Sequence, residues 1–478
     1  MNEIAQATAP PAEPQLDPGE DLVASLRPGV AGAAWPAMPN QFGITMLALQ
    51  YQFERTDRMT AAEIQAAQFG QLDLLLRHAV ANVPYYRQVL LAAGYAPDRK
   101  LTLEAWRRLP ILTRRTLQDR RAELIAAKYP PEHGTAAEHR SSGSTGVPIS
   151  VMKTQLCDLL WEAFTVRDHI WHRRDMTGVL VALRSRRSGE EGGADGARSA
   201  IWNHGVSSAF ATKEGWLFGG YRPVEEQIAW LLRRKPDYAQ MHPTVLRELL
   251  KVVKQRGIRF DGLKGFLTYS ELVPPGLREE TLAVLGIPMH DMYSCREIGY
   301  LALECPEHPH YHVQSEAVLL EVVDEAGAPC AIGQTGRVVA TPLHNFAQPL
   351  IRYALGDYAE LGPPCSCGRQ SPVLTRVLGR SRNMLRLANG QDGFPDTASL
   401  EKALHLPIRQ YQLVQRTRSH IEVRIVPQRT FTSAEEAELR DIIVNKCGAT
   451  GCTVTFAYCD SIPRTEGGKY EDFISEVV

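Results

Sequence analysis

The spacing of apolar residues predicts helices in the first part of the chain and alternating strands and helices later. Thr60 and Glu63 form a capping-box pair, and apolar positions from Leu72 to Val80 recur at helical spacing. This pattern predicts a helix that ends before Val83-Pro84. Proline near the start and glycine or proline beyond the end predict two more helices, over residues 223–234 and 243–257.

Strand patterns follow these helices. A buried strand is predicted over residues 262–270, and a strand pair over 317–323 and 337–341 around a Gly/Pro turn. The pattern then restarts, and it predicts three strands and a helix, over residues 411–414, 421–426, 453–458 and 434–446. Ser433 with Glu436 is expected to cap that helix, and Gly448 to end it.

These patterns predict a multidomain chain of α/β and α+β class. Residues 1–40, rich in proline and alanine, are expected to form a disordered leader. Residues 41–379 are expected to form a large domain of mixed sheets and helices, and residues 380–478 a small, mobile α+β domain. Residues 184–198, rich in glycine and charge, predict a mobile surface loop that acts as a lid.

Composition narrows the class of protein. The chain has 478 residues, 44% of them hydrophobic, which suits more than one globular domain. With 53 basic and 54 acidic residues the net charge is -1, which gives no electrostatic reason to bind nucleic acid or a membrane. No apolar run approaches about 18 residues, and no signal-peptide pattern is found, so a cytoplasmic location is expected. The nine cysteines show no disulfide pattern, and apart from one cluster they are expected to be free thiols.

One loop has the composition of a phosphate site. Six consecutive residues carry four hydroxyls and two glycines: Ser141, Ser142, Gly143, Ser144, Thr145 and Gly146. Glycine lets the backbone approach an anion, and hydroxyls with free N–H groups can surround phosphate oxygens. By itself such a segment is more often an ordinary surface loop, so its context decides.

Four later segments supply that context, in the order 293–299, 352–357, 379–383 and 464–469. Together with the loop they resemble the motif series of the adenylate-forming superfamily, which contains acyl-CoA synthetases, adenylation domains and luciferases. The strongest likeness is to the phenylacetate-CoA ligase family. It runs from about Leu72 to the C-terminus, and three further segments carry it: 82–87, 109–113 and 349–353.

The resemblance implies ATP-dependent activation of a carboxylic acid, aromatic or arylacetic, to an acyl-adenylate with release of pyrophosphate. Transfer to CoA would then give a thioester. Two alternatives stay open: transfer to an amine or hydroxyl acceptor, and a nucleotidyltransferase that adenylylates a phenol or a cofactor. A noncatalytic nucleotide-binding protein is disfavoured, because binding alone would not require Lys469. The implied partners are small molecules, and a homodimer is left open.

The resemblance also implies roles for single residues. The loop from Ser141 to Gly146 would hold the β- and γ-phosphates of ATP. The other nucleotide residues would be Tyr293 and Ser294 near the adenine, Glu297 on magnesium, Asp357 on the ribose hydroxyls, and Arg380 on ribose or phosphate. Lys469 would bridge the carboxylate and the α-phosphate as negative charge develops.

Three positions depart from the family pattern. Val147 stands where a lysine commonly follows the loop, so the phosphate charge must come from elsewhere, for instance Arg140. Two glycines precede Lys469 where relatives often have one. Arg382 occupies the usual hinge position between the domains, where Asp or Lys is common.

The acid and the acceptor are less well defined. By position, Tyr269, Met241 and His242 are expected to bind the acid, with Trp202, Phe210 and Pro243 nearby, although core packing is the commoner fate of such side chains. Residues 389–395 keep the family's Phe-Pro but alter the residues before it, which bear on thioester formation.

A cluster of soft ligands predicts a structural zinc site. Cys365 and Cys367 form a short knuckle, and Cys305 precedes a histidine-rich segment. Three thiolates and one imidazole would make a closed tetrahedral zinc site, and alignment with the family favours His312, with His308 and His310 as substitutes. Unpaired thiols and solvated histidines are the alternative.

Overall fold

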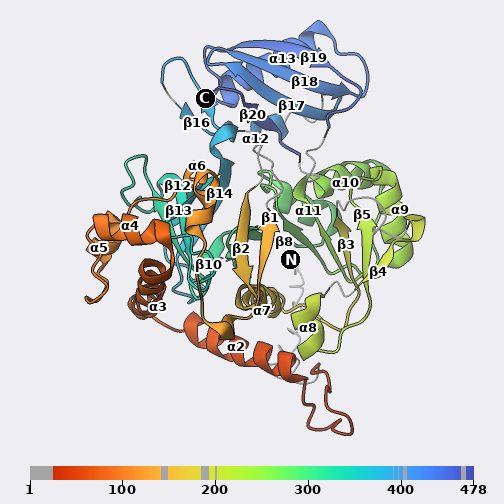
Figure 1. Cartoon of the computed structure of the whole chain (residues 1–478). Coiled ribbons are helices and arrows are strands. Elements are labelled where there is room, and N and C mark those ends of the chain that lie inside the picture. The colour runs from red at the N-terminus through yellow and green to blue at the C-terminus, as the bar shows by residue number, and fades with distance from the viewer. Residues whose placement is uncertain are drawn as a thin grey trace, which may run out of the picture.

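The structure is a computed structural model that describes residues 25–140, 149–184, 193–199, 202–390, 392–396, 398–401, 406–463 and 470–477. Figure 1 shows a large body built on a 12-stranded sheet and, above it, a smaller body built on a four-stranded sheet. We call the smaller one the C-terminal body. No helix in the described ranges is long and apolar enough to cross a membrane.

The large sheet has the order β11-β12-β13-β14-β10-β9-β8-β7-β6-β3-β5-β4. One half is parallel apart from its edge strand β4, and its strands are β3 (Leu180–Arg184), β4 (Ala197–Ser199), β5 (Gly215–Gly219), β6 (Tyr238–Met241), β7 (Gly265–Tyr269) and β8 (Met289–Cys295). The other half is antiparallel, with β9 (Gly299–Glu304), β10 (Tyr311–Val313), β11 (Val318–Val323), β12 (Thr335–Pro342), β13 (Tyr353–Gly362) and β14 (Val373–Arg380). The carboxyl ends of β3, β6, β7 and β8 therefore share one edge.

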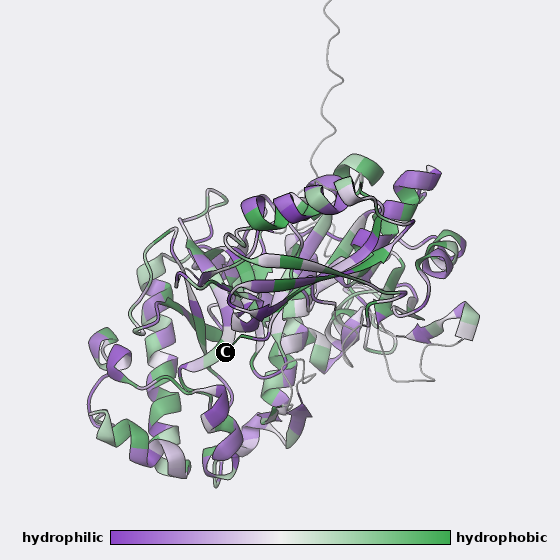
Figure 2. Cartoon of the chain, turned by 90° about the horizontal axis from the view of Figure 1, so that it is seen from above, coloured by the Kyte–Doolittle hydropathy of each residue, from purple (hydrophilic) through white to green (hydrophobic). Residues whose placement is uncertain are grey.

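Helices bury both faces of the parallel half. Val181 and Leu183 pack into a core with α9 (Val224–Arg234), α10 (Pro243–Arg256) and α11 (Leu277–Leu285). Leu180 points to the opposite face and packs with α2 (Gln41–Asp57), α7 (Gln155–Trp171) and α8 (Asn203–Ala209). Because alternate residues of a strand point to opposite faces, this burial explains why β3 is apolar throughout. Seen from above, the helices carry hydrophobic and hydrophilic residues side by side (Figure 2).

A second group of helices packs with the antiparallel half. It contains α3 (Ala61–Asn82), α4 (Pro84–Ala92), α5 (Leu103–Arg108) and α6 (Arg114–Asp119), followed by the short 3-10 turns Arg121–Leu124 and Pro131–His133. Thr60 and Glu63 form the predicted capping box at the start of α3, and Pro84 begins α4. β1 (Ala136–Arg140) and β2 (Ser150–Thr154) then pair as a separate hairpin.

The C-terminal body has the strand order β19-β18-β17-β20. Its elements are α12 (Ala398–Glu401), β17 (Ile408–Thr417), β18 (His420–Pro427), α13 (Ser433–Asp441), the π-helical turn Ile442–Lys446, β19 (Thr453–Tyr458) and β20 (Phe473–Ser475). The 3-10 turn η4 (Ser381–Asn383), β15 (Leu385–Arg386) and β16 (Asp392–Gly393) connect it to the large sheet.

Three local predictions differ from the structure. Thr432 and Glu435, not Ser433 and Glu436, cap α13, because Thr432 is extended and accepts the Glu435 N–H. Arg184 ends β3, and 197–199 form β4, so both ends of the predicted loop belong to strands; residues 185–192 lie outside the described residues. Residues 25–27, which belong to the predicted disordered leader, pair with residues 209–211 and are therefore ordered. Residues 1–24 are not described. The domain limits stay a prediction.

Candidate active site

Three of the predicted nucleotide residues meet where the parallel and antiparallel halves of the large sheet join. Tyr293 lies in β8, Asp357 in β13, and Arg380 is opposite Asp357 in β14. The Tyr293 hydroxyl donates to Asp357 Oδ2 at 2.8 Å, and Arg380 Nε lies 3.6 Å from Asp357 Oδ1. Segments more than 60 residues apart in the chain thus converge on one carboxylate.

Glycines shape the strands that bring these residues together. Gly356 and Gly379 precede Asp357 and Arg380, and both have φ in the left-handed region, at 82° and 94°. A Cβ at position 379 would also lie 2.5 Å from the Leu272 side chain. The sequence needs glycine at these positions because other residues rarely adopt this backbone conformation.

The carboxylate of Asp357 retains acceptor capacity. Burial and the neighbouring Asp357 charge raise the pKa of Tyr293 well above its usual value, so the phenol remains a donor. A carboxylate offers about four lone-pair sites, and Tyr293 takes one of them. The group can therefore accept further hydroxyl donors.

Glu297 lies in the turn between β8 and β9, near two cations. It is buried, at 9% exposed, and Arg114 Nη1 is 3.9 Å from its Oε1. Lys153 in β2 is only 4% exposed, and its Nζ donates to the Arg296 carbonyl at 3.4 Å. No ion pair joins Lys153 to a carboxylate within the described ranges. Ser294, also predicted, is opposite Tyr300 in β9 and half-buried.

The sequence motifs did not predict a role for Lys153, because it lies outside the loop motif. The available signal was its position two residues after the buried Val151, which places both side chains on the same face of the strand. Arg140, the predicted substitute, is exposed at the end of β1, 3.6 Å from Glu138. The loop residues Ser141 to Gly146, and Lys469, lie outside the described residues, so their roles stay predictions.

Arg352, in a predicted motif, has an architectural role. It is 2% exposed, pairs with Glu321 at 3.0 and 3.1 Å, and donates to the Leu109 carbonyl at 2.6 Å. Leu112 in turn bridges to Tyr353 at the start of β13. Arg352 thus joins the segment before α6 to the strand that carries Asp357.

The residues predicted to bind the acid lie at the ends of β6 and β7, with Met241 and Tyr269 as the last strand residues and His242 just after β6. The ring of His242 lies 4.8 Å from that of Tyr269, and its Nδ1 is 3.3 Å from the Tyr269 carbonyl. Met241 is fully buried in the core. Trp202 and Phe210 also lie in a core, and Pro243 begins α10. Acid binding by Tyr269, Met241 and His242 stays a prediction.

Several contacts join the C-terminal body to this edge of the large sheet. Glu271, after β7, accepts the Thr244 hydroxyl at 2.7 Å and the Tyr470 backbone N–H at 2.9 Å. Tyr470 follows Lys469 in the sequence. Arg247 in α10 donates to both oxygens of Asp472, at 3.0 and 2.7 Å.

The predicted hinge also contacts this region. Arg382 in η4 forms an ion pair with Glu471, and the Asn383 side chain donates to the Phe473 carbonyl at 2.6 Å. The connector is thereby tied to the segment that precedes and forms β20.

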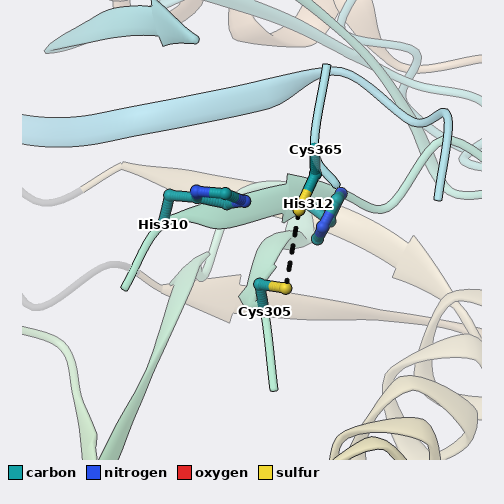
Figure 3. Close-up of side chains that lie close together, drawn as sticks. All are labelled: Cys305, His310, His312 and Cys365. Atoms are coloured by element: carbon teal, nitrogen blue, oxygen red, sulfur yellow. Dashed lines mark hydrogen bonds between the residues drawn. The ribbon is translucent and has the colours of Figure 1, made fainter. Parts of the chain in front are cut away.

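The predicted zinc ligands also converge. Ligand atoms of Cys305, His310, His312 and Cys365 all lie within 4.8 Å of one another (Figure 3). Cys367 Sγ is 3.3 Å from His312 Nε2, so either His310 or Cys367 could be the fourth ligand beside Cys305, His312 and Cys365. Ser371 Oγ lies 3.3 Å from His312 Nδ1, where it can orient the ring. Buried thiols and imidazoles at this spacing fit zinc.

Comparisons with known proteins find similar sequences and folds. A family model described as the CapK C-terminal domain matches residues 398–476. Phenylacetate-coenzyme A ligase of Thermus thermophilus is 27% identical over 88% of this chain and 98% of its own length. The Escherichia coli enzyme of the same name is 28% identical, over 85% and 93%.

A solved 2-hydroxyisobutyryl-CoA ligase shares the fold. In its postadenylation state with 2-HIB-AMP, it gives a TM-score of 0.69 at 20% identity, covering 88% of this chain and 92% of its own. In its thioesterification state, with 2-HIB-AMP and CoA, the TM-score is 0.58, covering 89% and 92%. The TM-score is thus higher against the postadenylation state than against the thioesterification state.

The fold is that of adenylate-forming CoA ligases. The chain is phenylacetate-CoA ligase-like over most of its length, and these relatives support an AMP-forming CoA ligase. The predicted resemblance, fold class and enzyme class are confirmed. The relatives named above are phenylacetate-coenzyme A ligases, and the solved 2-hydroxyisobutyryl-CoA ligase binds 2-HIB-AMP, in one state together with CoA.

Proposed function

We propose that this protein activates an aromatic or arylacetic acid with ATP and transfers the acyl group to CoA. The observation that carries the proposal is the convergence of Tyr293, Asp357 and Arg380, three nucleotide residues from three separate motifs, around one carboxylate. The class of acid rests on the named relatives and on the aromatic character of the Tyr269 and His242 region.

In this proposal the nucleotide lies along the carboxyl edge of β8. Asp357 accepts the ribose hydroxyls while Tyr293 lies beside the adenine, and Arg380 contacts ribose or phosphate. Glu297 would hold magnesium, a hard cation that also binds phosphate oxygens and spreads their charge. The loop from Ser141 to Gly146 would surround the β- and γ-phosphates.

Lys153 supplies the cation that the loop lacks at Val147. Two features support this role. The buried ammonium donates to a backbone carbonyl and pairs with no carboxylate of the described residues, and it lies at the turn that carries Glu297. A buried lysine without a counter-ion is unfavourable, and a bound triphosphate would provide one.

Lys469 is proposed as the adenylation lysine. The acid's carboxylate attacks the α-phosphorus, pyrophosphate leaves with the electrons of the broken P–O bond, and the ammonium stabilises the negative charge of the transition state. The hydrogen bond from Tyr470 to Glu271 supports this role, because it ties the residue after Lys469 to the loop after β7.

Transfer to CoA would require a different arrangement of the two bodies. We propose residues 380–478 as the moving domain and Arg382 as its hinge. The acyl carbonyl would then accept the CoA thiolate, and AMP would leave. Residues 389–395 would bear on this step, and Phe394 packs against Tyr358 of β13, with ring centroids 5.5 Å apart.

A structural zinc is part of the proposal. The thiolates of Cys305 and Cys365 and the His312 imidazole would be ligands, and Cys367 or His310 would be the fourth. Four protein ligands leave no position for water, so the ion would fix the loop between β13 and β14 to the segment between β9 and β10.

The test is pyrophosphate release from ATP and magnesium across a panel of aromatic, arylacetic and aliphatic acids, with and without CoA. We expect release that depends on the acid, favours arylacetic acids and reaches multiple turnovers with CoA. Lys469→Ala should abolish release, whereas Lys254→Ala, at an exposed lysine of α10, should not.

Two outcomes would contradict the proposal. Release that needs an acid but is not accelerated by CoA would assign another acceptor. Full release by Lys469→Ala would remove the proposed lysine mechanism.

A further inference from the structure

Four side chains gather at the carboxyl edge of the parallel strands. Arg184 ends β3, Gln240 lies in β6, His242 follows β6, and Tyr269 ends β7. β3 pairs with β6, and β6 with β7, all in parallel, so these strand ends share one edge of the sheet. We call these four residues the carboxyl-edge cluster.

The cluster fixes the direction of the Arg184 guanidinium. Its Nη2 donates to Gln240 Oε1 at 2.6 Å, and its Cζ lies 5.6 Å from the centroid of the Tyr269 ring. The Tyr269 ring in turn packs against His242. A planar cation held by an amide and an aromatic ring keeps its other donors oriented for a further acceptor.

Arg184 has no anionic partner in the part of the chain that the structure describes. Its Nε is buried there and makes no hydrogen bond. Glu271, two residues after Tyr269, accepts from Thr244 and Tyr470 instead. A buried donor without an acceptor is unfavourable, and such exceptions in a folded protein call for a ligand or another partner.

The cluster lies at a suitable distance from the nucleotide residues. In the strand order β8-β7-β6-β3, Arg184 is three strands away from Tyr293. Neighbouring strands are about 4.8 Å apart, so the two backbones are separated by about 14 Å. An acid activated at the carboxyl edge of β8 would extend toward Arg184 with the end opposite to its reacting carboxylate.

We propose that Arg184 binds a second anionic group of the acid, so the preferred substrate is a carboxylic acid with a second carboxylate at its distal end. This inference rests on the proposed function and specifies its substrate. Arg184 is a specificity residue in this account, because its contact is with the part of the acid that does not react.

The test compares acids of matched size in the pyrophosphate-release assay. Phenylacetate and para-methylphenylacetate are compared with meta- and para-carboxyphenylacetate, and hexanoate is compared with adipate. Within each comparison, we expect the diacid with the higher kcat/KM to exceed the matched monoacid at least about tenfold. This factor is the scale of a hydrogen bond to a charged group. Arg184→Gln should remove this preference, and Arg184→Lys should retain part of it.

A matched control is available in Arg198→Gln. Arg198 lies in the edge strand β4, two strands from β3, is 72% exposed and pairs with Glu214, so its loss should leave the preference unchanged. Circular dichroism and thermal unfolding establish that each variant is folded. The wild-type comparison needs no variant.

The possible failures are distinguishable. No release with any acid would overturn the proposed function itself. Equal kcat/KM for monoacids and diacids in the wild-type enzyme would overturn only the role of Arg184. An equal loss for both kinds of acid in Arg184→Gln would also overturn it, because Arg184 would then serve the reacting carboxylate.

Discussion

The contact between Arg247 and Asp472 should favour adenylation over transfer to CoA. It joins α10 to the segment just before β20 through two hydrogen bonds, and the two side chains are only 9% and 18% exposed. Asp472→Asn removes the charge but keeps one acceptor oxygen. It should therefore weaken the contact without disturbing the packing.

The magnitude follows from the geometry. A hydrogen bond between charged groups contributes about 1.5–3 kcal/mol when partly buried, so replacing the ion pair by a hydrogen bond from Arg247 to a neutral amide should cost about 2 kcal/mol. This corresponds to about a 30-fold change in the equilibrium between the present arrangement and any arrangement in which the contact is broken. Adenylation should slow by up to that factor.

The assay measures the two half-reactions separately. Single-turnover pyrophosphate release without CoA reports adenylation, and thioester formation from preformed acyl-AMP reports transfer. Asp472→Asn should slow the first and leave the second unchanged or faster. Glu476→Gln is the control, because the ion pair of Glu476 with Arg416 lies within the C-terminal body. Equal slowing of both half-reactions, or of neither, would refute the reasoning.

Three further predictions concern single side chains. Metal analysis should find about one zinc per chain; Cys365→Ser should lose it and lower Tm, whereas the buried Cys330→Ser, away from the site, should retain it. Arg352→Met should reduce the free energy of unfolding in urea by about 3–5 kcal/mol, because it leaves Glu321 buried and unpaired; a loss below about 1 kcal/mol would contradict the architectural role. Lys153→Met should raise KM for ATP at least about tenfold, and Arg140→Gln, at an exposed arginine, should not. The reverse result would identify Arg140, not Lys153, as the cation that binds the phosphates.

Local sequence signals predicted several elements close to where the structure has them. The capping box at Thr60, the helices α9 and α10 and the pairing of β11 with β12 are all found near the predicted positions. The cap of α13 was displaced by one residue because Thr432 and Ser433 are each followed three residues later by glutamate. Only the backbone conformation, supported by the ion pair of Arg429 with Glu435, selects the first.

The residues that the sequence did not reveal depend on neighbours far away in the chain. Lys153 gains significance from the Glu297 turn, which follows it by more than a hundred residues. Arg184 was assigned to a loop because a glycine-rich, charged run begins there, whereas its strand position and its contacts with Gln240 and Tyr269 arise from pairing in the sheet. Pattern within one segment cannot show such contacts.

The most direct test of the account is the fate of ATP labelled at the α-phosphate, incubated with magnesium, phenylacetate or a carboxyphenylacetate, and CoA. The account predicts that label appears as AMP in amounts equal to the acyl-CoA formed, that acyl-AMP accumulates when CoA is omitted, and that no AMP forms without an acid. Label in ADP, or AMP formation that is independent of the acid, would contradict an adenylate-forming ligase.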